Sequence, residues 1–248
     1  MELDHTVLDV MVLDDETLMP LGRPTLAIAI DAFTRCILGI CIGFEPPCTS
    51  TVSQCLKSVF SPKERLLALV SDIENAWDCF GKIETLVLDQ ALENHALFLD
   101  RLALTQSIEI LYCPRKTPWF KARIERFIGT LNSSVCHKIP GTTFSNIQQK
   151  GDYNPVCQAV CTMAGLKAAI IKWIVDIYHV RRHRVATSWY VQGTILSSMC
   201  RSARIHSNRM GSESLCSLYS TRDHDAEILP GMRQANKSAS NWSHHVQL

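Results

Sequence analysis

Hydrophobic positions in the first 115 residues fall into short runs that predict five strands. Leu3–Leu13 is rich in Val, Leu and Met and predicts a first strand, and a turn-rich loop, DDETLMPLGRP, follows it. TLAIAIDAF and CILGICIGF alternate between apolar and polar positions and predict two more strands, so the three form an antiparallel meander. The continuous apolar run in KIETLVLDQ predicts a fourth strand that is buried on both faces, and IEILYC predicts a fifth.

Helical periods separate and follow these strands. Ser50–Phe60 and Glu93–Ser107 have apolar residues at helical spacing, and Pro62 can begin another helix that runs to about Val70. The clearest amphipathic helix lies in TPWFKARIERFIGTLN, where the apolar stripe consists of Phe120, Ile124, Phe127, Ile128 and Leu131. Three antiparallel strands followed by strand–helix units predict an α/β fold with a mixed sheet and helices on its faces.

The chain divides into three parts by pattern. Residues 1–140 hold the strands and helices of the predicted core. Residues 141–197 predict a helical extension, in which a long helix runs from about Val156 to Val180. In 198–248 serine dominates, aliphatic residues thin out and no period persists, so we expect a poorly ordered tail.

Composition excludes several classes of protein. The hydrophobic fraction, 46%, is that of a globular protein, and no apolar run reaches the ~18 residues that a membrane span needs. The acidic N-terminus lacks the basic region of a signal peptide, so the 11 scattered cysteines predict reduced thiols and not a disulfide framework. We therefore expect a cytoplasmic protein with no membrane partner.

Charge is distributed unevenly along the chain. Residues 1–31 carry seven acids against one base, whereas 113–140 carry six bases against one acid and 167–184 five against one. One interpretation is an acidic cleft flanked by surfaces that bind phosphates. The other is a set of solvated faces that share no geometry.

Three carboxylates are candidates for catalysis. Asp4 lies in the first predicted strand, Asp89 ends the fourth and Glu125 lies on the amphipathic helix. A long crossover allows the first and fourth strands to pair in parallel, which would bring Asp4 beside Asp89. Three acids that gather without bases need a cation, and oxygen ligands favour Mg²⁺ or Mn²⁺. The alternative for Glu125 is a surface salt bridge with Lys121, in the weaker helical order.

Five segments in order resemble one enzyme family. They are ELDHTVLD, GRPTLAIAIDAFTRCILG, KIETLVLDQALE, LYCPRKTPWFKARIERFIGTLN and IVDIYHVRRH. Together they resemble the catalytic core of DDE transposases and retroviral-type integrases, most of all the TniA-type transposases, over roughly residues 1–184. The 35 residues between Asp89 and Glu125 are typical of that family.

The resemblance implies a ribonuclease-H-like fold and DNA transposition by phosphoryl transfer. It implies that Asp4, Asp89 and Glu125 hold two Mg²⁺ or Mn²⁺ ions, whereas Asp31 matches a family position that is not a ligand. We expect DNA as partner, a homo-oligomer on DNA, accessory transposition proteins and a bacterial, nucleoid-associated location. Residues expected to hold DNA phosphates are Lys116, Lys121, Arg123, Arg126, Arg181 and Arg182.

Two departures from the family keep other functions open. Gln90-Ala91 stand where the family has Asn-Gly, and alanine resists the positive-φ turn that glycine allows. The residues after IVDIYHVRRH do not match the family, and a frameshifted or decayed tail is one explanation. The alternatives are therefore an impaired transposase fragment that binds DNA non-specifically, or a ribonuclease-H-like nuclease that only hydrolyses.

Two smaller constellations have structural alternatives. Cys157, Cys161, His179 and His183 have zinc-finger spacing within each pair, but a helix between the pairs would hold them ~27 Å apart, so we expect no zinc site. Trp119, Trp173 and Tyr178 could stack on bases, but aromatic residues in helices are more often part of a core.

Overall fold

The structure is a computed structural model that describes residues 1–90, 97–114, 119, 121–143 and 154–181. All of these lie in one compact unit, Met1–Ser207. The predicted tail, 198–248, lies outside the described residues, as does the last part of the predicted extension, 182–197. In the described part of the chain, no helix is both long and apolar enough to cross a membrane.

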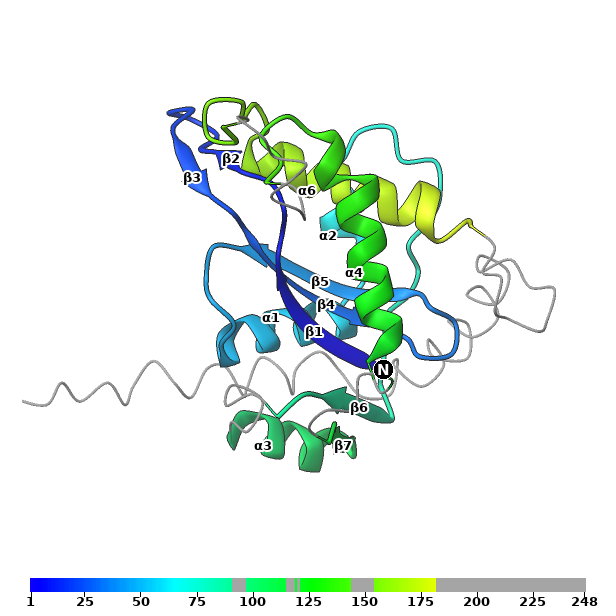
Figure 1. Cartoon of the computed structure of the whole chain (residues 1–248). Helices are drawn as coiled ribbons and strands as arrows, with labels where there is room; N and C mark the ends of the chain where they lie inside the picture. The colour runs from blue at the N-terminus through cyan, green and yellow to red at the C-terminus, as the bar shows by residue number, and fades with distance from the viewer. Residues whose placement is uncertain (91–96, 115–118, 120, 144–153, 182–248) are drawn as a thin grey trace, which may run out of the picture. The chain divides into compact units, whose positions relative to one another are not determined.

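A mixed five-stranded sheet forms the centre of the described unit (Figure 1). Its order is β5-β4-β1-β6-β7, antiparallel between β5, β4 and β1 and parallel from β1 to β6 and β7. This arrangement confirms the predicted fold class, a ribonuclease-H-like α/β fold with three antiparallel strands followed by parallel units. The strands are β1 Glu2–Val7, β4 Thr25–Ile30, β5 Ile37–Gly43, β6 Thr85–Leu88 and β7 Glu109–Tyr112.

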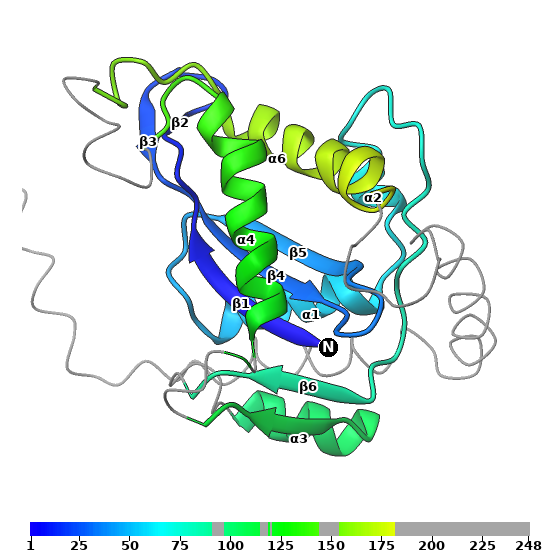
Figure 2. The same ribbon diagram turned by 45° about the vertical axis from the view of Figure 1, so that its right-hand side comes forward.

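The first predicted strand divides into two elements. We expected Leu3–Leu13 to be continuous, but β1 ends at Val7 and a separate pair, β2 Val12–Leu13 and β3 Pro20–Gly22, follows (Figure 2). The break has a physical cause, because the backbone at Asp9 bonds outside the sheet. The C=O of Asp9 accepts from the N–H of Thr143, and the N–H of Met11 donates to Gly141.

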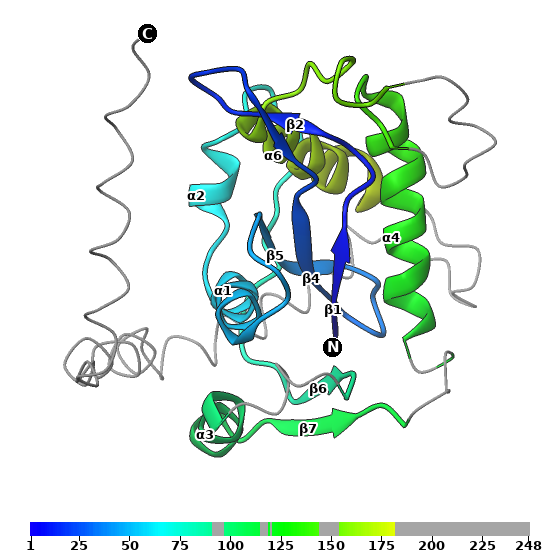
Figure 3. The same cartoon turned by 60° about the vertical axis from the view of Figure 1, so that its left-hand side comes forward.

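Helices cover both faces of the sheet. Helix α1, Thr49–Phe60, packs on β4 and β5, and helix α4, Ala122–Ser134, packs on β1 and β4 from the opposite face (Figure 3). All six residues of β4 are therefore buried. Gly39 permits the close approach of α1, since a Cβ there would lie 2.7 Å from Val59 Cγ2. Two further helices are α2 Glu64–Leu67 and α3 Leu97–Gln106.

The predicted long helix is wrong at its start and irregular at its end. Helix α6 runs only from Met163 to Lys172, because the side chain of Thr162 accepts from the N–H of Gly165 and begins the helix there. A π-helical segment, Trp173–Tyr178, continues it. The helix expected over Val156–Val180 is therefore much shorter than its apolar pattern indicated.

The apolar stripe of α4 forms part of the main core, as predicted. Ile124, Phe127 and Leu131 are buried, whereas Phe120 lies outside the described residues. The ring of Phe127 lies 5.9 Å from that of Trp173 and 4.7 Å from that of Tyr178. Both partners are buried, which supports the core interpretation of these two aromatic residues over base stacking.

Candidate active site

The parallel register of β1 and β6 brings two of the three candidate carboxylates together. Glu2 pairs with Val87 across these strands. Asp4 lies two residues after Glu2 and Asp89 two residues after Val87, and both carboxylates lie within 4 Å of the same ammonium group, that of Lys121. The sheet thus creates the proximity that we expected from the order of the strands.

Lys121 lies between these two carboxylates. Its ammonium group is 2.7 Å from Asp4 Oδ1 and 3.7 Å from Asp89 Oδ2. Only 8% of the residue is exposed, so the stem is packed and the charge is largely removed from water. A single cation therefore compensates Asp4 and Asp89, which would otherwise repel each other.

Glu125 lies one helical turn after Lys121, on α4, and is exposed. Among the described residues, the ion pairs of Lys121 are with Asp4 and Asp89 and none is with Glu125. The alternative salt bridge between Glu125 and Lys121 is therefore absent from this part of the chain. The described residues also include no ready-made group of three or more His, Cys, Asp or Glu side chains for a metal ion.

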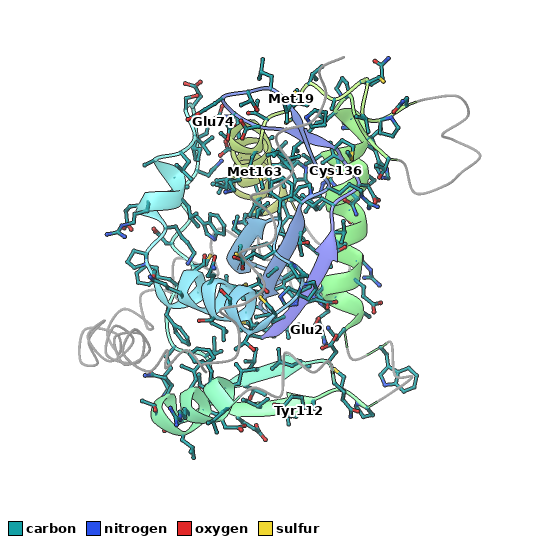
Figure 4. All side chains as sticks on the ribbon, turned by 90° about the vertical axis from the view of Figure 1, so that its left-hand side faces the viewer. Glu2, Met19, Glu74, Tyr112, Cys136 and Met163 are labelled. Carbon is teal, nitrogen blue, oxygen red and sulfur yellow. The ribbon has the colours of Figure 1, made fainter. Side chains whose placement is uncertain are left out.

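Glu2 is a site residue that the sequence did not reveal. Its side chain is buried at the start of β1, beside the N-terminal end of α4 (Figure 4). Glu2 Oε1 accepts from Arg123 Nη1 at 2.9 Å, and Oε2 accepts from the N–H of Ile124 at 3.2 Å. The period of two in β1 places Glu2 on the same face as Asp4, which was the available signal.

The basic residues expected to bind DNA have different environments. Lys121 is buried against Asp4 and Asp89, and Arg123 is paired with Glu2 while its side chain remains 41% exposed. Arg126 and Arg181 are exposed, and so is Trp119. Lys116 and Arg182 lie outside the described residues. An open phosphate-binding surface would therefore depend on Arg126 and Arg181 more than on Lys121.

Asp31 closes the turn between β4 and β5. Its Oδ2 accepts from both the N–H and the hydroxyl of Thr34, at 2.6 and 2.7 Å, and Arg35 in the same turn has a φ of 66°. Asp31 is thus a turn residue at the end of a strand.

Tyr178 and His179 form hydrogen bonds with the backbone at the end of this turn and at the start of β5. The hydroxyl of Tyr178 donates to the C=O of Arg35, and His179 Nε2 accepts from the N–H of Ile37. Burial lowers the pKa of His179 to about 3, which fits the role of Nε2 as an acceptor. Tyr178 and His179, two residues of the segment IVDIYHVRRH, therefore have structural roles.

The family comparison matches the part of the chain that holds these residues. The family model described as the TnsB C-terminal domain matches residues 2–141. The chain is 25% identical over 145 residues to the transposase for transposon Tn552 of Staphylococcus aureus, and 30% identical over 145 residues to the Tn7 transposition protein TnsB of Escherichia coli. These alignments cover 58% and 56% of the chain but only 28% and 20% of the relatives.

Solved structures give more distant likenesses. A simian T-cell lymphotropic virus intasome in complex with PP2A regulatory subunit B56 gamma matches with 14% identity and a TM-score of 0.45, over 77% of this chain and 52% of that one. The catalytic core domain of BIV integrase matches with 12% identity and a TM-score of 0.41, over 81% and 95%. The fold assignment depends on the strand order described above and not on these likenesses.

Proposed function

Because the chain belongs to the TnsB C-terminal domain family, we propose that it contains the catalytic core of a DNA transposase. The names of two relatives, a transposase and a transposition protein, support this reaction class. The chain spans less than a third of the length of either relative. We therefore propose, as further parts of this function, that it acts on DNA, forms a homo-oligomer and works with accessory transposition proteins.

The observation that supports catalysis most directly is the pairing of Asp4 and Asp89 with one cation. Their carboxylates lie within ion-pair distance of Lys121, which makes this a place where positive charge is held between two oxygen donors. The donors are hard oxygens, the type that Mg²⁺ and Mn²⁺ prefer. Glu125, one turn along α4, is the third carboxylate of the proposed set.

The proposed reaction is phosphoryl transfer, which joins or nicks DNA. Two divalent ions held by Asp4, Asp89 and Glu125 would activate the attacking oxygen and stabilise the leaving oxygen. Two basic residues would assist this reaction. In the absence of metal, Lys121 compensates the charges of Asp4 and Asp89, and with DNA bound the exposed guanidinium of Arg126 contacts a phosphate.

Thermal melts of the full chain with and without Mn²⁺ test the metal set. A site filled at a hundred times its Kd gains about 2.7 kcal/mol, or roughly 5–10 °C in a chain of this size. We expect Glu125→Gln to leave metal-free stability equal or slightly higher, because in the proposed set it removes a negative charge that would face Asp4 and Asp89, and to reduce the gain with Mn²⁺. Glu64→Gln, an exposed acid on α2, is the control and should keep the full gain.

Activity on DNA separates the competing functions. The parent with Mn²⁺ should nick plasmid DNA and join oligonucleotide 3′ ends to it, and Asp4→Asn should abolish both. Nicking without joining would favour the nuclease that only hydrolyses. An Mn²⁺ response that Glu125→Gln leaves unchanged would remove Glu125 from the metal set, and a parent without Mn²⁺ response would favour the impaired fragment.

A further inference from the structure

Glu2 is a buried carboxylate with only 1% of its surface exposed. A carboxylate buried in this way is strongly unfavourable unless other groups compensate it. Glu2 lies at the start of β1, two residues before Asp4, and both residues therefore project from the same face of the strand. The compensation for Glu2 comes from the same helix that compensates Asp4.

The first turn of α4 supplies both partners of Glu2. Arg123 Nη1 donates to Oε1 at 2.9 Å, and the N–H of Ile124 donates to Oε2 at 3.2 Å. Ile124 is the third helical residue, and its N–H has no carbonyl partner within the helix. Positive potential at a helix N-terminus also favours an anion at this position.

The N-cap residue of helix α4 provides no side-chain cap. Lys121 occupies the N-cap position, and its side chain makes no capping hydrogen bond. Serine, threonine, aspartate and asparagine usually fill this role from within the helix. In this chain a strand residue 122 positions earlier supplies the capping carboxylate instead.

The two contacts fix α4 against β1 at its first turn. Asp4 holds Lys121 at 2.7 Å, and Glu2 holds Ile124, the residue directly before Glu125. We propose that Glu2 is a positioning residue, which sets the height and rotation at which α4 presents Glu125 relative to Asp4. Its effect on metal binding rests on the function proposed above, whereas its hold on the first turn of α4 does not.

Amide hydrogen exchange tests the hold on α4 directly. In Glu2→Ala the amide of Ile124 should exchange about tenfold faster or more, as expected for the loss of one charge-assisted hydrogen bond. Glu2→Gln keeps a neutral acceptor and should give a smaller increase, so it also serves if the alanine variant does not fold. Amides in the last turn of α4 should exchange at the parent's rate.

Mn²⁺ titration of the same full-length proteins tests the consequence for the site. Removal of a group that orients a metal ligand commonly weakens affinity by about 10-fold to 100-fold, so we expect Glu2→Gln to bind Mn²⁺ about tenfold more weakly. Asp9→Asn is the matched control, because Asp9 accepts from Arg23 and contacts His137 near the other end of α4. The Mn²⁺ affinity of Asp9→Asn should stay within about twofold of the parent's, a smaller change than the weakening expected when an orienting group is lost.

Three outcomes would overturn the inference. Unchanged exchange at Ile124 in both Glu2 variants would show that Glu2 does not hold the helix. Parent-like Mn²⁺ affinity in Glu2→Gln would remove the effect on the site, and equal weakening in Asp9→Asn would indicate general destabilisation. If the parent itself binds no Mn²⁺, the proposed function fails and the exchange at Ile124 alone decides whether Glu2 positions α4.

Discussion

His179 Nε2 accepts a hydrogen bond from the backbone N–H of Ile37 at 3.0 Å, across 142 positions of the chain. The indole N–H of Trp77 donates to the C=O of the same residue at 2.8 Å. His179 is 4% exposed, and its Nδ1 is buried with no hydrogen-bond partner among the described residues. The imidazole is therefore held neutral, and protonation of Nε2 would break its bond to Ile37.

This bond predicts a loss of stability in mild acid. Burial lowers the pKa of His179 to about 3 from the ordinary 6.5, so between these values the unfolded chain binds a proton that the folded chain does not. The contribution of His179 to the free energy of unfolding is thus fully present above pH 6.5, and between pH 6.5 and about 3 it is lost at up to about 1.4 kcal/mol for each pH unit.

Urea unfolding at about pH 7 and about pH 5 measures this dependence. His179→Gln cannot titrate, and its amide oxygen can accept from Ile37, so its pH dependence should be shallower by about one proton. An identical pH dependence in parent and variant would mean that His179 titrates normally in the folded protein.

Lys121→Met should destabilise the metal-free protein by about 1–3 kcal/mol. The change removes a charge that is largely buried and leaves Asp4 and Asp89 without it, while methionine keeps most of the packed stem. Chemical denaturation without divalent ions measures the loss. In the control Lys172→Met, the pair with Asp176 is 3.3 Å long and the lysine side chain is 44% exposed, so the loss should stay below about 1 kcal/mol.

The same Lys121 variant has a second expected result with metal. If divalent ions take up the charge that Lys121 now compensates, the stability gained on adding Mn²⁺ should be larger in Lys121→Met than in the parent. A smaller gain would indicate that Lys121 assists the metal site instead of competing with it.

Gly39→Ala should destabilise the sheet by roughly 1–3 kcal/mol, the usual range for overpacking. The new Cβ would lie 2.8 Å from the carbonyl oxygen of Cys55 and 2.7 Å from Val59 Cγ2, so α1 would have to move away from β5. In the control Gly129→Ala, on α4, nothing lies within 4 Å of the new Cβ. That variant should be stabilised by up to about 1 kcal/mol through helix propensity, and thermal melts would distinguish the two.

Arg126→Gln should weaken DNA binding most at low salt. Each phosphate contact contributes about 0.9 to the slope of log K against log salt concentration, so the loss of one contact should reduce the slope by about that amount. Titration of a labelled duplex at several salt concentrations measures it. Arg65→Gln, an exposed arginine on α2, is the control, and an equal effect of both variants would indicate a diffuse charge effect without a contact at Arg126.

Local patterns predicted the elements whose residues bury a regular face. The stripe of α4 and the strands β4 and β6 were all predicted, and the stripe lies in the core at its expected period. The two strands differ from their patterns, because β4, whose sequence alternates, is buried at all six positions, whereas β6, expected to be buried on both faces, alternates between intermediate and buried residues. The predicted ends of helices and strands were wrong where one side chain or one backbone group forms a hydrogen bond that the pattern does not reveal. Thr162 begins α6 seven residues after the apolar pattern starts near Val156, and the bonds of Asp9 to Thr143 end the first strand early.

The sequence predicted the acids of the candidate site but not the basic residue that compensates their charge. Strand order alone predicted that Asp4 lies near Asp89, and in the structure both carboxylates contact Lys121. The sequence could not assign Lys121 to those carboxylates, because the side chain reaches them from a helix more than a hundred residues after Asp4. The period of two in β1 places Glu2 on the face of Asp4, but the sequence could not show that the partner of Glu2 is a helix N-terminus 122 positions later.

The contacts of Ile37 have a consequence for association between molecules. Strand β5 is last in the order of the sheet, so its outer backbone groups could template an added strand from another chain. His179 and Trp77 occupy the N–H and C=O of Ile37, and after the irregularity in β5 the hydroxyl of Ser58 accepts from the N–H of Ile40. Side chains of this chain thus occupy three backbone groups of β5, at Ile37 and Ile40, and an added strand could pair there only by displacing them.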